Sequence, residues 1–312
     1  MITKLNKKDL ISMEDLTREE IELILNISDM IRTKHKNNEL FVPLLGKCLA
    51  MIFRKPSTRT RVSFEVAMFH LGGASIYLSP NEIQLSRGET IADTAKVLSR
   101  YVNGIMIRTF SHQEVIDLAK NATIPVINGL TDFSHPCQII SDLLTIKDKK
   151  KVLDGLTLAY IGDGNNVCNS WLFAAPKTGM NLKIATPEGY APDKNVLEKA
   201  KNIAQTAKTQ VMVTETPEEA VKDADVIYTD VWTSMGQEEE TEKRRATFKK
   251  YQVNSELVHL AKKDVIIMHC LPAHRGEEIT DDVMDGPNSV VFDQAENRLH
   301  AQKGILALLM NR

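Results

Sequence analysis

The stretch Phe53-Arg54-Lys55-Pro56-Ser57-Thr58-Arg59-Thr60-Arg61-Val62-Ser63-Phe64-Glu65 joins a short apolar run to a predicted helix. The run at 48–53 is bounded by turn residues and predicts a buried parallel strand, which Pro56 separates from the next segment of the chain. Ser57 is a natural N-cap, apolar residues at helical spacing come next, and Gly72-Gly73 end the pattern. The stretch therefore predicts a strand, a turn and a helix.

The first turn of that helix predicts an anion site. Residues 57–60 lie where unpaired backbone N–H groups and the positive end of the helix dipole favour an anion. The alternative is a merely capped helix whose arginines are solvated or paired with Glu65. Because Lys55, Arg59 and Arg61 cluster in a chain of net charge −2, the anion site is the favoured interpretation.

The composition predicts a folded soluble protein of two domains, since 312 residues with 43% apolar side chains are ample for two cores. A net charge of −2 argues against a nucleic-acid partner or an anionic membrane surface. The four cysteines lie far apart, so neither a zinc knuckle nor a disulfide framework is indicated. No signal peptide, transit peptide or membrane-spanning run is evident, so the cytoplasm is the expected location.

Alternating strand and helix patterns predict an α/β fold of two domains, each a mostly parallel sheet flanked by helices. A capping box predicts a helix at 17–33. A lysine cluster at 147–151 marks the predicted boundary, giving domains 1–150 and 151–293, with a C-terminal helix at about 294–312 expected to pack back on the first. Strands are predicted at 48–53, 75–78, 105–107, 124–127, 156–161, 182–185, 211–214, 226–229, 265–269 and 290–292.

A highly charged stretch at 238–250 offers i, i+4 pairs, Glu239 with Lys243 and Glu240 with Arg244. A solvated helix is the favoured interpretation, and a moving lid is the alternative.

Gly162-Asp163-Gly164 follows a predicted strand and resembles part of a dinucleotide-binding turn. Val167 stands where the third glycine should be, so NAD binding is disfavoured. The loop still presents Asn165 or Asn166 at the carboxyl end of a strand, where open α/β sheets bind ligands. An amide there could hold a carboxylate or an ammonium. The alternative for Asn165 is a turn residue with left-handed backbone.

Two further predicted strands are followed by side chains that could contact a substrate. Asp230 begins the stretch Asp230-Val231-Trp232-Thr233-Ser234-Met235-Gly236-Gln237-Glu238, and a carboxylate there suits a cationic substrate group. Cys270 lies in His269-Cys270-Leu271-Pro272-Ala273 at the end of another strand. A metal is disfavoured because no second pair has suitable spacing. A lone cysteine is usually a buried small hydrophobe, but its position at a strand end makes a substrate contact at least as favoured.

These motifs together resemble the aspartate/ornithine carbamoyltransferase family. The resemblance rests on Ser57-Thr58-Arg59-Thr60-Arg61, His135-Pro136-Cys137-Gln138 and His269-Cys270-Leu271-Pro272, in that order along the chain. The stretch from Asp230 to Glu238 is similar to the signature of the ornithine members. Departures are slight, since Arg54 stands where many relatives have Glu and Ser86 where many have Gly. Arg54 would add to the positive field.

The resemblance implies roles for individual residues. Three catalytic residues are implied, Arg108, His135 and Cys270. Implied carbamoyl phosphate ligands are Ser57, Thr58, Arg59, Thr60, Arg108, His135, Gln138, Cys270, Leu271 and Arg298, with Gln84 reaching in from a neighbouring subunit. Implied ornithine ligands are Asn166, Asp230, Ser234 and Met235, which selects Asn166 over Asn165. Arg61 is expected to support the loop. The resemblance further implies an active site between the domains, a homotrimer or a multiple of trimers, and no metal or organic cofactor.

The implied reaction is attack by the side-chain amine of ornithine on carbamoyl phosphate, through a tetrahedral intermediate, to give citrulline and phosphate. An amine with a pKa of about 10 costs roughly 4 kcal/mol to deprotonate near pH 7, and a site crowded with arginines lowers that cost. A putrescine carbamoyltransferase is the runner-up, and a non-catalytic ligand-binding paralogue is the alternative from another class. A dehydrogenase is disfavoured by the missing glycine.

Overall fold

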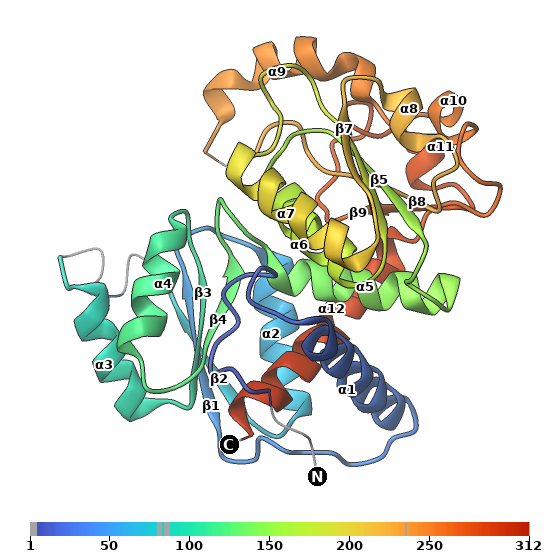
Figure 1. Ribbon diagram of the computed structural model, residues 1–312. Helices are drawn as coiled ribbons and strands as arrows, with labels where there is room; N and C mark the ends of the chain where they lie inside the picture. The colour runs from blue at the N-terminus through green and yellow to red at the C-terminus, as the bar shows by residue number, and fades with distance from the viewer. Residues whose placement is uncertain (1–4, 80–82, 84–87, 235, 312) are drawn as a thin grey trace. The chain divides into compact units, whose positions relative to one another are not determined.

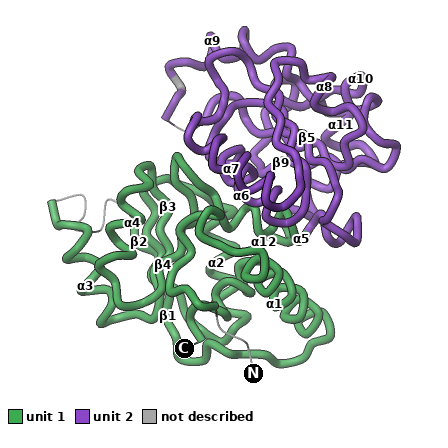
Figure 2. Tube along the Cα trace, viewed as in Figure 1, with its two compact units in different colours: residues 1–144, 296–312 green, residues 145–295 purple. Residues whose placement is uncertain are grey.

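The computed structural model describes residues 5–79, 83, 88–234 and 236–311. The chain forms two compact units (Figure 2), residues Met1–Leu144 with Glu296–Arg312, and residues Thr145–Ala295. The divisions fall inside two helices, α5 (Pro136–Lys150) and α12 (Val291–Met310). The predicted boundary at 150 lies at the end of α5. Among the described residues, no helix is both long and apolar enough to cross a membrane.

Unit 1 is built on a parallel sheet of four strands in the order β2-β1-β3-β4 (Figure 1). The strands are β1 (Cys48–Phe53), β2 (Ala74–Leu78), β3 (Gly104–Arg108) and β4 (Val126–Leu130). Four of its helices are α1 (Arg18–Lys36), α2 (Thr58–His70), α3 (Ile91–Tyr101) and α4 (His112–Asn121).

Apolar packing holds helices α3 and α4 against that sheet. Ile52 and Ile107 on neighbouring strands share a buried cluster with Ala95 of α3 and with Val115 and Leu118 of α4. The predicted parallel α/β arrangement is confirmed here.

The C-terminal part of α12 also packs within unit 1. Arg32 of α1 donates to the Asn297 side chain at 2.9 Å. At Gly104, the first residue of β3, an added Cβ would lie 3.0 Å from the sulfur of Met310. Glycine therefore lets the helix approach the strand closely, and this packing carries Arg298 into unit 1.

Strand register places the predicted anion-binding turn beside a second strand end. Phe53 of β1 pairs with Arg108 of β3, and the Arg54 N–H donates to the Arg108 carbonyl at 2.8 Å. The chain then enters α2, where the Ser57 hydroxyl caps the helix by accepting from the Thr60 N–H at 3.2 Å. The predicted strand, turn and capped helix are confirmed.

Unit 2 repeats the scheme with five parallel strands in the order β7-β6-β5-β8-β9. They are β5 (Thr157–Ile161), β6 (Asn181–Ala185), β7 (Val211–Thr214), β8 (Val226–Thr229) and β9 (Ile266–His269). Its helices include α6 (Asn166–Lys177), α7 (Lys194–Ala207), α8 (Pro217–Val221), α9 (Thr241–Phe248), α10 (Ser255–Val258) and α11 (Asp281–Met284). Because β5, β8 and β9 are neighbours and parallel, the loops that follow them meet at one edge of the sheet.

One predicted strand, at 290–292, is wrong. Only a single bridge forms there, between Ser289 and Ile267 of β9. Gln294 N–H then donates to the Val290 carbonyl at 2.8 Å, which starts α12. Three β-branched and aromatic residues are too short a run to separate a strand from the first turn of a helix, and the long helical pattern after them prevails.

Candidate active site

Arg298 of α12 joins the candidate residues of unit 1. Its Nη2 donates to the hydroxyl of Thr60 at 2.8 Å and to His135 Nε2 at 3.2 Å, and its Nη1 donates closely to Gln138 Oε1. Gln138 in turn donates from Nε2 to Asp142 at 2.7 Å. A guanidinium presents its donors in a fixed fork, so this geometry orients all three acceptors together.

His135 immediately precedes α5 and is buried. Burial, and then the nearby Arg298 and Arg108 charges, hold the pKa of His135 well below its usual range, so the ring is neutral at pH 7. Because a guanidinium can only donate, Nε2 is the acceptor in the contact with Arg298 and the ring hydrogen is on Nδ1. A neutral ring in this tautomer can polarise a carbonyl from Nδ1 without adding a charge.

The remaining candidate residues of unit 1 lie at element ends. Arg108 is the last residue of β3 and is buried, whereas Thr58 and Arg59 lie exposed on the first turn of α2. Gln84 lies outside the described residues. Within unit 1 the structure thus brings together Ser57, Thr60, His135, Gln138 and Arg298 by hydrogen bonds, with Arg108 close enough to act on the His135 ring.

Two of the cations that suggested an anion site, Lys55 and Arg61, are paired with carboxylates, and so is Arg54 beside them. Arg61 Nε donates to Glu65 at 3.0 Å, Arg54 pairs with Glu114, and buried Lys55 pairs with Asp132. Arg61 also stacks on the Tyr77 ring, and Lys55 on Phe110. The carboxylate of Glu114 therefore offsets the charge that Arg54 was expected to add to the positive field. The paired alternative holds for Arg61, and the candidate cations are Arg59, Arg108 and Arg298.

Asp230 organises the candidate residues of unit 2. It follows β8 and is buried, and its Oδ2 accepts from Asn165 Nδ2 at 2.7 Å. Its Oδ1 accepts from the Cys270 thiol at 2.9 Å and from the Val231 N–H at 2.8 Å. The ends of β8 and β9 thus meet at this carboxylate, and a carboxylate oriented from two sides can receive a cationic group.

Asn165 and Asn166 have different roles in the fold. Asn165 has φ −80°, so the left-handed turn is excluded, and its side chain caps α6 by accepting from the Val167 and Cys168 N–H groups. The Tyr160 hydroxyl also donates to this amide oxygen at 3.1 Å. Asn166 is the first residue of α6 and is half-buried. Asn165 therefore orients Asp230 by hydrogen bonding to its Oδ2. The sequence did not predict this contact.

Ser234 and Leu271 lie in tight loops. The Ser234 N–H donates to Gln237 Oε1 at 3.1 Å, and the Gln237 N–H returns to the Ser234 carbonyl at 3.0 Å. Leu271 has φ +58°, and its N–H donates to His269 Nδ1 at 2.8 Å. The His269 ring therefore holds the backbone that carries Cys270. Met235 lies outside the described residues.

A buried ion pair in unit 2 was not predicted. Arg244 Nη1 donates to Asp163 Oδ2 at 2.8 Å and to the Trp232 carbonyl at 2.9 Å. Its Nε donates to Glu240 at 2.9 Å, so that predicted pair is confirmed. Arg244 is only 5% exposed, however, so the stretch is not simply a solvated helix. Burial raises the pKa of Asp163, and Arg244 opposes that shift.

Gly164, beside Asp163, serves packing. A Cβ on Gly164 would lie 2.4 Å from the nitrogen of Pro192, so only glycine fits there. The loop is therefore shaped by its contact with the chain at 190–192. The acid between two glycines at a strand end was the sequence signal for the Arg244 pair.

Asp230, His269 and Cys270 bring potential metal-ligand atoms within 4.8 Å of one another. Both nitrogens of His269 are already hydrogen bonded, Nδ1 to Leu271 and Nε2 to Glu278 at 2.9 Å. The Cys270 thiol is committed to Asp230. This group is better described as an internal hydrogen-bond network than as a metal centre.

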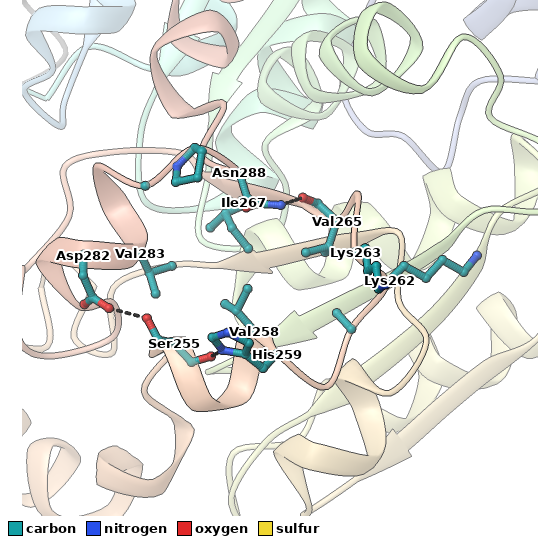
Figure 3. A pocket seen from close by; sticks show the side chains of 13 residues that line it. Ser255, Val258, His259, Lys262, Lys263, Val265, Ile267, Asp282, Val283 and Asn288 are labelled. Atoms are coloured by element: carbon teal, nitrogen blue, oxygen red, sulfur yellow. Dashed lines mark hydrogen bonds between the residues drawn. The ribbon is translucent and has the colours of Figure 1, made fainter.

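A cavity of about 400 Å³ lies elsewhere in unit 2 (Figure 3). It is bordered by α10, α11 and the edge strand β9, and two of its lining residues are joined where the Asn288 side chain donates to the Val265 carbonyl at 2.7 Å. None of the candidate residues lines it. The cavity is therefore separate from the chemistry at the strand ends.

The fold and these side chains together define the family to which the protein belongs. The chain belongs to the aspartate/ornithine carbamoyltransferase family: residues 8–148 match its carbamoyl-P binding domain and residues 154–309 its Asp/Orn binding domain. The resemblance inferred from the motifs is confirmed.

Within that family, the chain is similar to proteins named ornithine carbamoyltransferases. The chain is 58% identical over 310 residues to the ornithine carbamoyltransferase of Thermococcus kodakarensis, covering 99% of this chain and 98% of the relative. It is 57% identical over 310 residues to the anabolic ornithine carbamoyltransferase of Pyrococcus furiosus, with the same coverage. The solved P. furiosus structure superposes with a TM-score of 0.96 at 57% identity, covering 99% of both chains. That from Gloeobacter violaceus gives 0.88 at 46% identity, covering 99% of this chain and 100% of that one.

Proposed function

We propose that this chain transfers the carbamoyl group of carbamoyl phosphate to the side-chain amine of L-ornithine, giving L-citrulline and phosphate. The observation on which the proposal rests is the guanidinium of Arg298, which donates hydrogen bonds to Thr60, His135 and Gln138 in unit 1. The carbamoyl-P binding domain of the family matches residues 8–148, which contain Thr60, His135 and Gln138, and the T. kodakarensis and P. furiosus relatives are named ornithine carbamoyltransferases.

The phosphate is proposed to bind at the start of α2. Ser57, Thr58, Arg59 and Thr60 offer N–H groups, hydroxyls and a guanidinium there, and Arg108 adds a second guanidinium. The carbonyl oxygen needs donors that strengthen as negative charge develops on it during attack. Arg108, Thr58 and the neutral His135 are proposed to supply them, with Gln138 and Arg298 beside the carbamoyl group.

Ornithine is proposed to bind at the strand ends of unit 2. Asp230 attracts the ammonium form of the side chain, while Asn166, Ser234 and Met235 hold the α-amino acid head. Cys270 and Leu271 lie beside the reacting amine in this proposal. The amine must lose a proton before it attacks, and the nearby arginines favour its neutral form.

The bond changes balance without a cofactor. The neutral amine nitrogen bonds to the carbonyl carbon, which gives a tetrahedral intermediate with its negative oxygen held by Arg108, Thr58 and His135. Collapse breaks the bond from carbon to the phosphate oxygen, and phosphate leaves with the electron pair. The proton that the nitrogen carries in excess after bonding passes to the leaving phosphate, which departs as hydrogen phosphate, and citrulline remains.

Assembly and location are part of the same proposal. A homotrimer, or a multiple of trimers, would let Gln84 of one subunit reach the carbamoyl phosphate of another. We infer a cytoplasmic enzyme without nucleic-acid or membrane partners. Its use in arginine biosynthesis is supported by the P. furiosus relative, which is named anabolic.

Product stoichiometry tests the function. Purified protein is incubated with carbamoyl phosphate and ornithine, and citrulline and phosphate are measured in the same samples. The proposal expects equal amounts of both above the spontaneous hydrolysis of carbamoyl phosphate. Phosphate release without citrulline would contradict it, as would a protein that binds carbamoyl phosphate but turns over no ornithine, which is the behaviour of a non-catalytic paralogue.

A further inference from the structure

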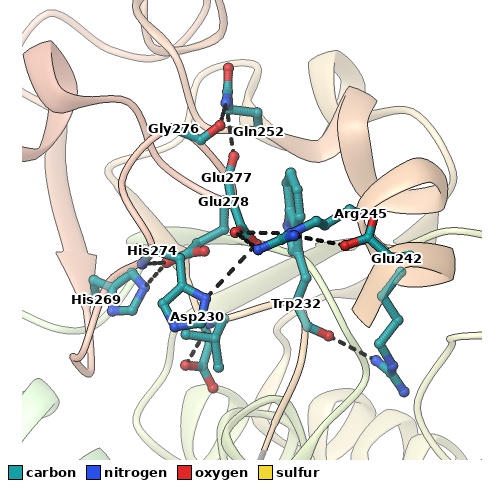
Figure 4. A network of polar contacts seen from close by, with 12 residues as sticks. Asp230, Trp232, Glu242, Arg245, Gln252, His269, His274, Gly276, Glu277 and Glu278 are labelled. Carbon is teal, nitrogen blue, oxygen red and sulfur yellow. Dashed lines mark hydrogen bonds and ion pairs between the residues drawn. The ribbon is translucent and has the colours of Figure 1, made fainter. Parts of the chain in front are cut away.

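The loop after β9 gathers a second set of polar side chains in unit 2 (Figure 4). Potential ligand atoms of His274, Glu277 and Glu278 all lie within 4.8 Å of one another, and His274 Nδ1 lies 3.8 Å from Glu277 Oε2. The His274 side chain is 49% exposed and Glu277 24%, whereas Glu278 is fully buried. An ion could therefore enter from solvent and still be held by a rigid acid.

Each carboxylate in this set has one oxygen fixed by hydrogen bonds. Glu277 Oε1 accepts from Arg245 Nε at 3.0 Å and Nη2 at 2.7 Å. Glu278 Oε1 accepts from His269 Nε2 at 2.9 Å and from the His274 N–H at 2.6 Å. Metal-binding carboxylates are commonly oriented in this way by partners on the second oxygen.

The other oxygen of Glu278 gives separate support for a bound ion. Glu278 Oε2 is buried and has no hydrogen-bond partner among the described residues. Buried carboxylate oxygens are almost always paired, because leaving one unpaired is costly. An ordered water or an ion is the usual partner of such an atom, and the imidazole of His274 with the carboxylate of Glu277 beside it favours an ion.

The charges around the site favour a divalent cation. Glu277 shares the guanidinium of Arg245 with Glu242, to which Nη1 donates at 2.9 Å, and Glu278 adds a third carboxylate to the group. Three carboxylates against one guanidinium leave two negative charges, which one divalent ion neutralises. The Asp230, His269 and Cys270 group differs, since its His nitrogens and its thiol are already committed.

We propose that His274, Glu277 and Glu278 bind a divalent first-row transition-metal ion, with water completing its coordination. Ligands about 2.1 Å from such an ion lie roughly 3 to 4 Å apart, and the 3.8 Å between His274 Nδ1 and Glu277 Oε2 fits that range. One imidazole with two carboxylates suits Zn²⁺, Co²⁺ or Ni²⁺ better than Mg²⁺ or Ca²⁺.

The bound ion has a structural role. Glu278 connects it to His269, and His269 holds the Leu271 N–H. Binding therefore stiffens the loop that carries Cys270 and Leu271, while carbamoyl transfer itself requires no metal.

Zinc binding to chelator-treated full-length protein tests the site. Calorimetry is done on a Cys270→Ser variant, so that the Cys270 thiol cannot contribute to any Zn²⁺ signal. One Zn²⁺ per chain is expected, and adding His274→Ala or the isosteric Glu277→Gln should weaken binding by at least about 100-fold. His259→Ala, an exposed histidine of unit 2 outside the set, is the matched control and should leave the affinity unchanged.

Thermal unfolding supplies a second measurement. Zn²⁺ should raise the midpoint of the Cys270→Ser protein and of its His259→Ala derivative, and should leave that of the His274→Ala derivative unmoved. Absence of Zn²⁺ binding by the Cys270→Ser protein would overturn the proposal. Affinity that survives both His274→Ala and Glu277→Gln would overturn it equally.

Discussion

The Cys270 thiol donates a hydrogen bond to Oδ1 of Asp230 at 2.9 Å. The two residues are far apart in the chain but follow neighbouring parallel strands, β9 and β8. With Asn165 on the other carboxylate oxygen, Asp230 is oriented from both sides. The direction of its carboxylate is therefore fixed before an amine arrives, and this relationship leads to the first prediction.

Asp230→Asn should weaken ornithine binding while sparing carbamoyl phosphate. The substitution keeps the shape and removes the charge, and a hydrogen bond to a charged group contributes about 1.5–3 kcal/mol. The KM for ornithine should rise on the order of 10- to 100-fold. Glu239→Gln, the same chemical change at an exposed position, is the control. An unchanged KM in Asp230→Asn would show that the amine binds elsewhere.

Arg298→Lys should damage carbamoyl phosphate binding and turnover together. A lysine keeps the charge but cannot reach Thr60, His135 and Gln138 from one planar group. We expect a loss of about 100-fold in turnover, in the range found when an oxyanion donor is removed. Arg61→Lys, whose guanidinium pairs with Glu65, should change turnover by less than about 3-fold. Equal effects of the two substitutions would refute the role given to Arg298.

The buried pair of Arg244 and Asp163 makes a prediction about stability. Arg244→Met leaves a buried carboxylate without its partner, which typically costs about 3–5 kcal/mol. Adding Asp163→Asn should recover a large part of that loss, because the uncompensated charge is removed. Urea unfolding of the two single variants and the double variant measures the coupling. If the double variant were as unstable as the sum of the singles, the pair would not be coupled.

His300 makes the stability of the protein depend on pH. It is buried in α12, and burial lowers its pKa to about 4, below the unfolded value of about 6.5. As the pH falls below 6.5 the unfolded chain takes up a proton that the folded chain does not, so stability is lost. Between pH 7 and pH 5 this amounts to about 2 kcal/mol.

His300→Gln should remove that part of the pH dependence. The free energy of unfolding is measured at pH 7 and pH 5, with His259→Gln at an exposed position as the control. An undiminished difference between the two pH values in His300→Gln would rule out this residue as the cause.

Local signals in the sequence sufficed for much of the fold and site. Ser57 is a cap whose preference is set by its own backbone, and strand ends such as Asp230 can be located from short apolar runs. The pairing of Lys55 with Asp132, and of Arg244 with Asp163, joins residues far apart in the chain. Composition and periodicity cannot give such partners, because they arise only when strand order and loop packing are known.

The failed strand at 290–292 has a related cause. Its residues have strand propensity, but the edge of β9 accepts only one bridge from Ser289 before α12 begins. The set of His274, Glu277 and Glu278 was not predicted, because it depends on a buried carboxylate oxygen of Glu278. The burial of one side chain cannot be predicted from the sequence of a short polar loop.

Competition between amines tests the central claim most directly. The protein is given carbamoyl phosphate with ornithine and putrescine together, at equal concentrations well below saturation, and both carbamoylated products are measured. Putrescine lacks the α-amino acid head, so the proposed contacts of Asn166 and Ser234 should favour citrulline by at least about 100-fold. A product mixture in which carbamoylputrescine equals or exceeds citrulline would contradict the assignment of ornithine as the acceptor.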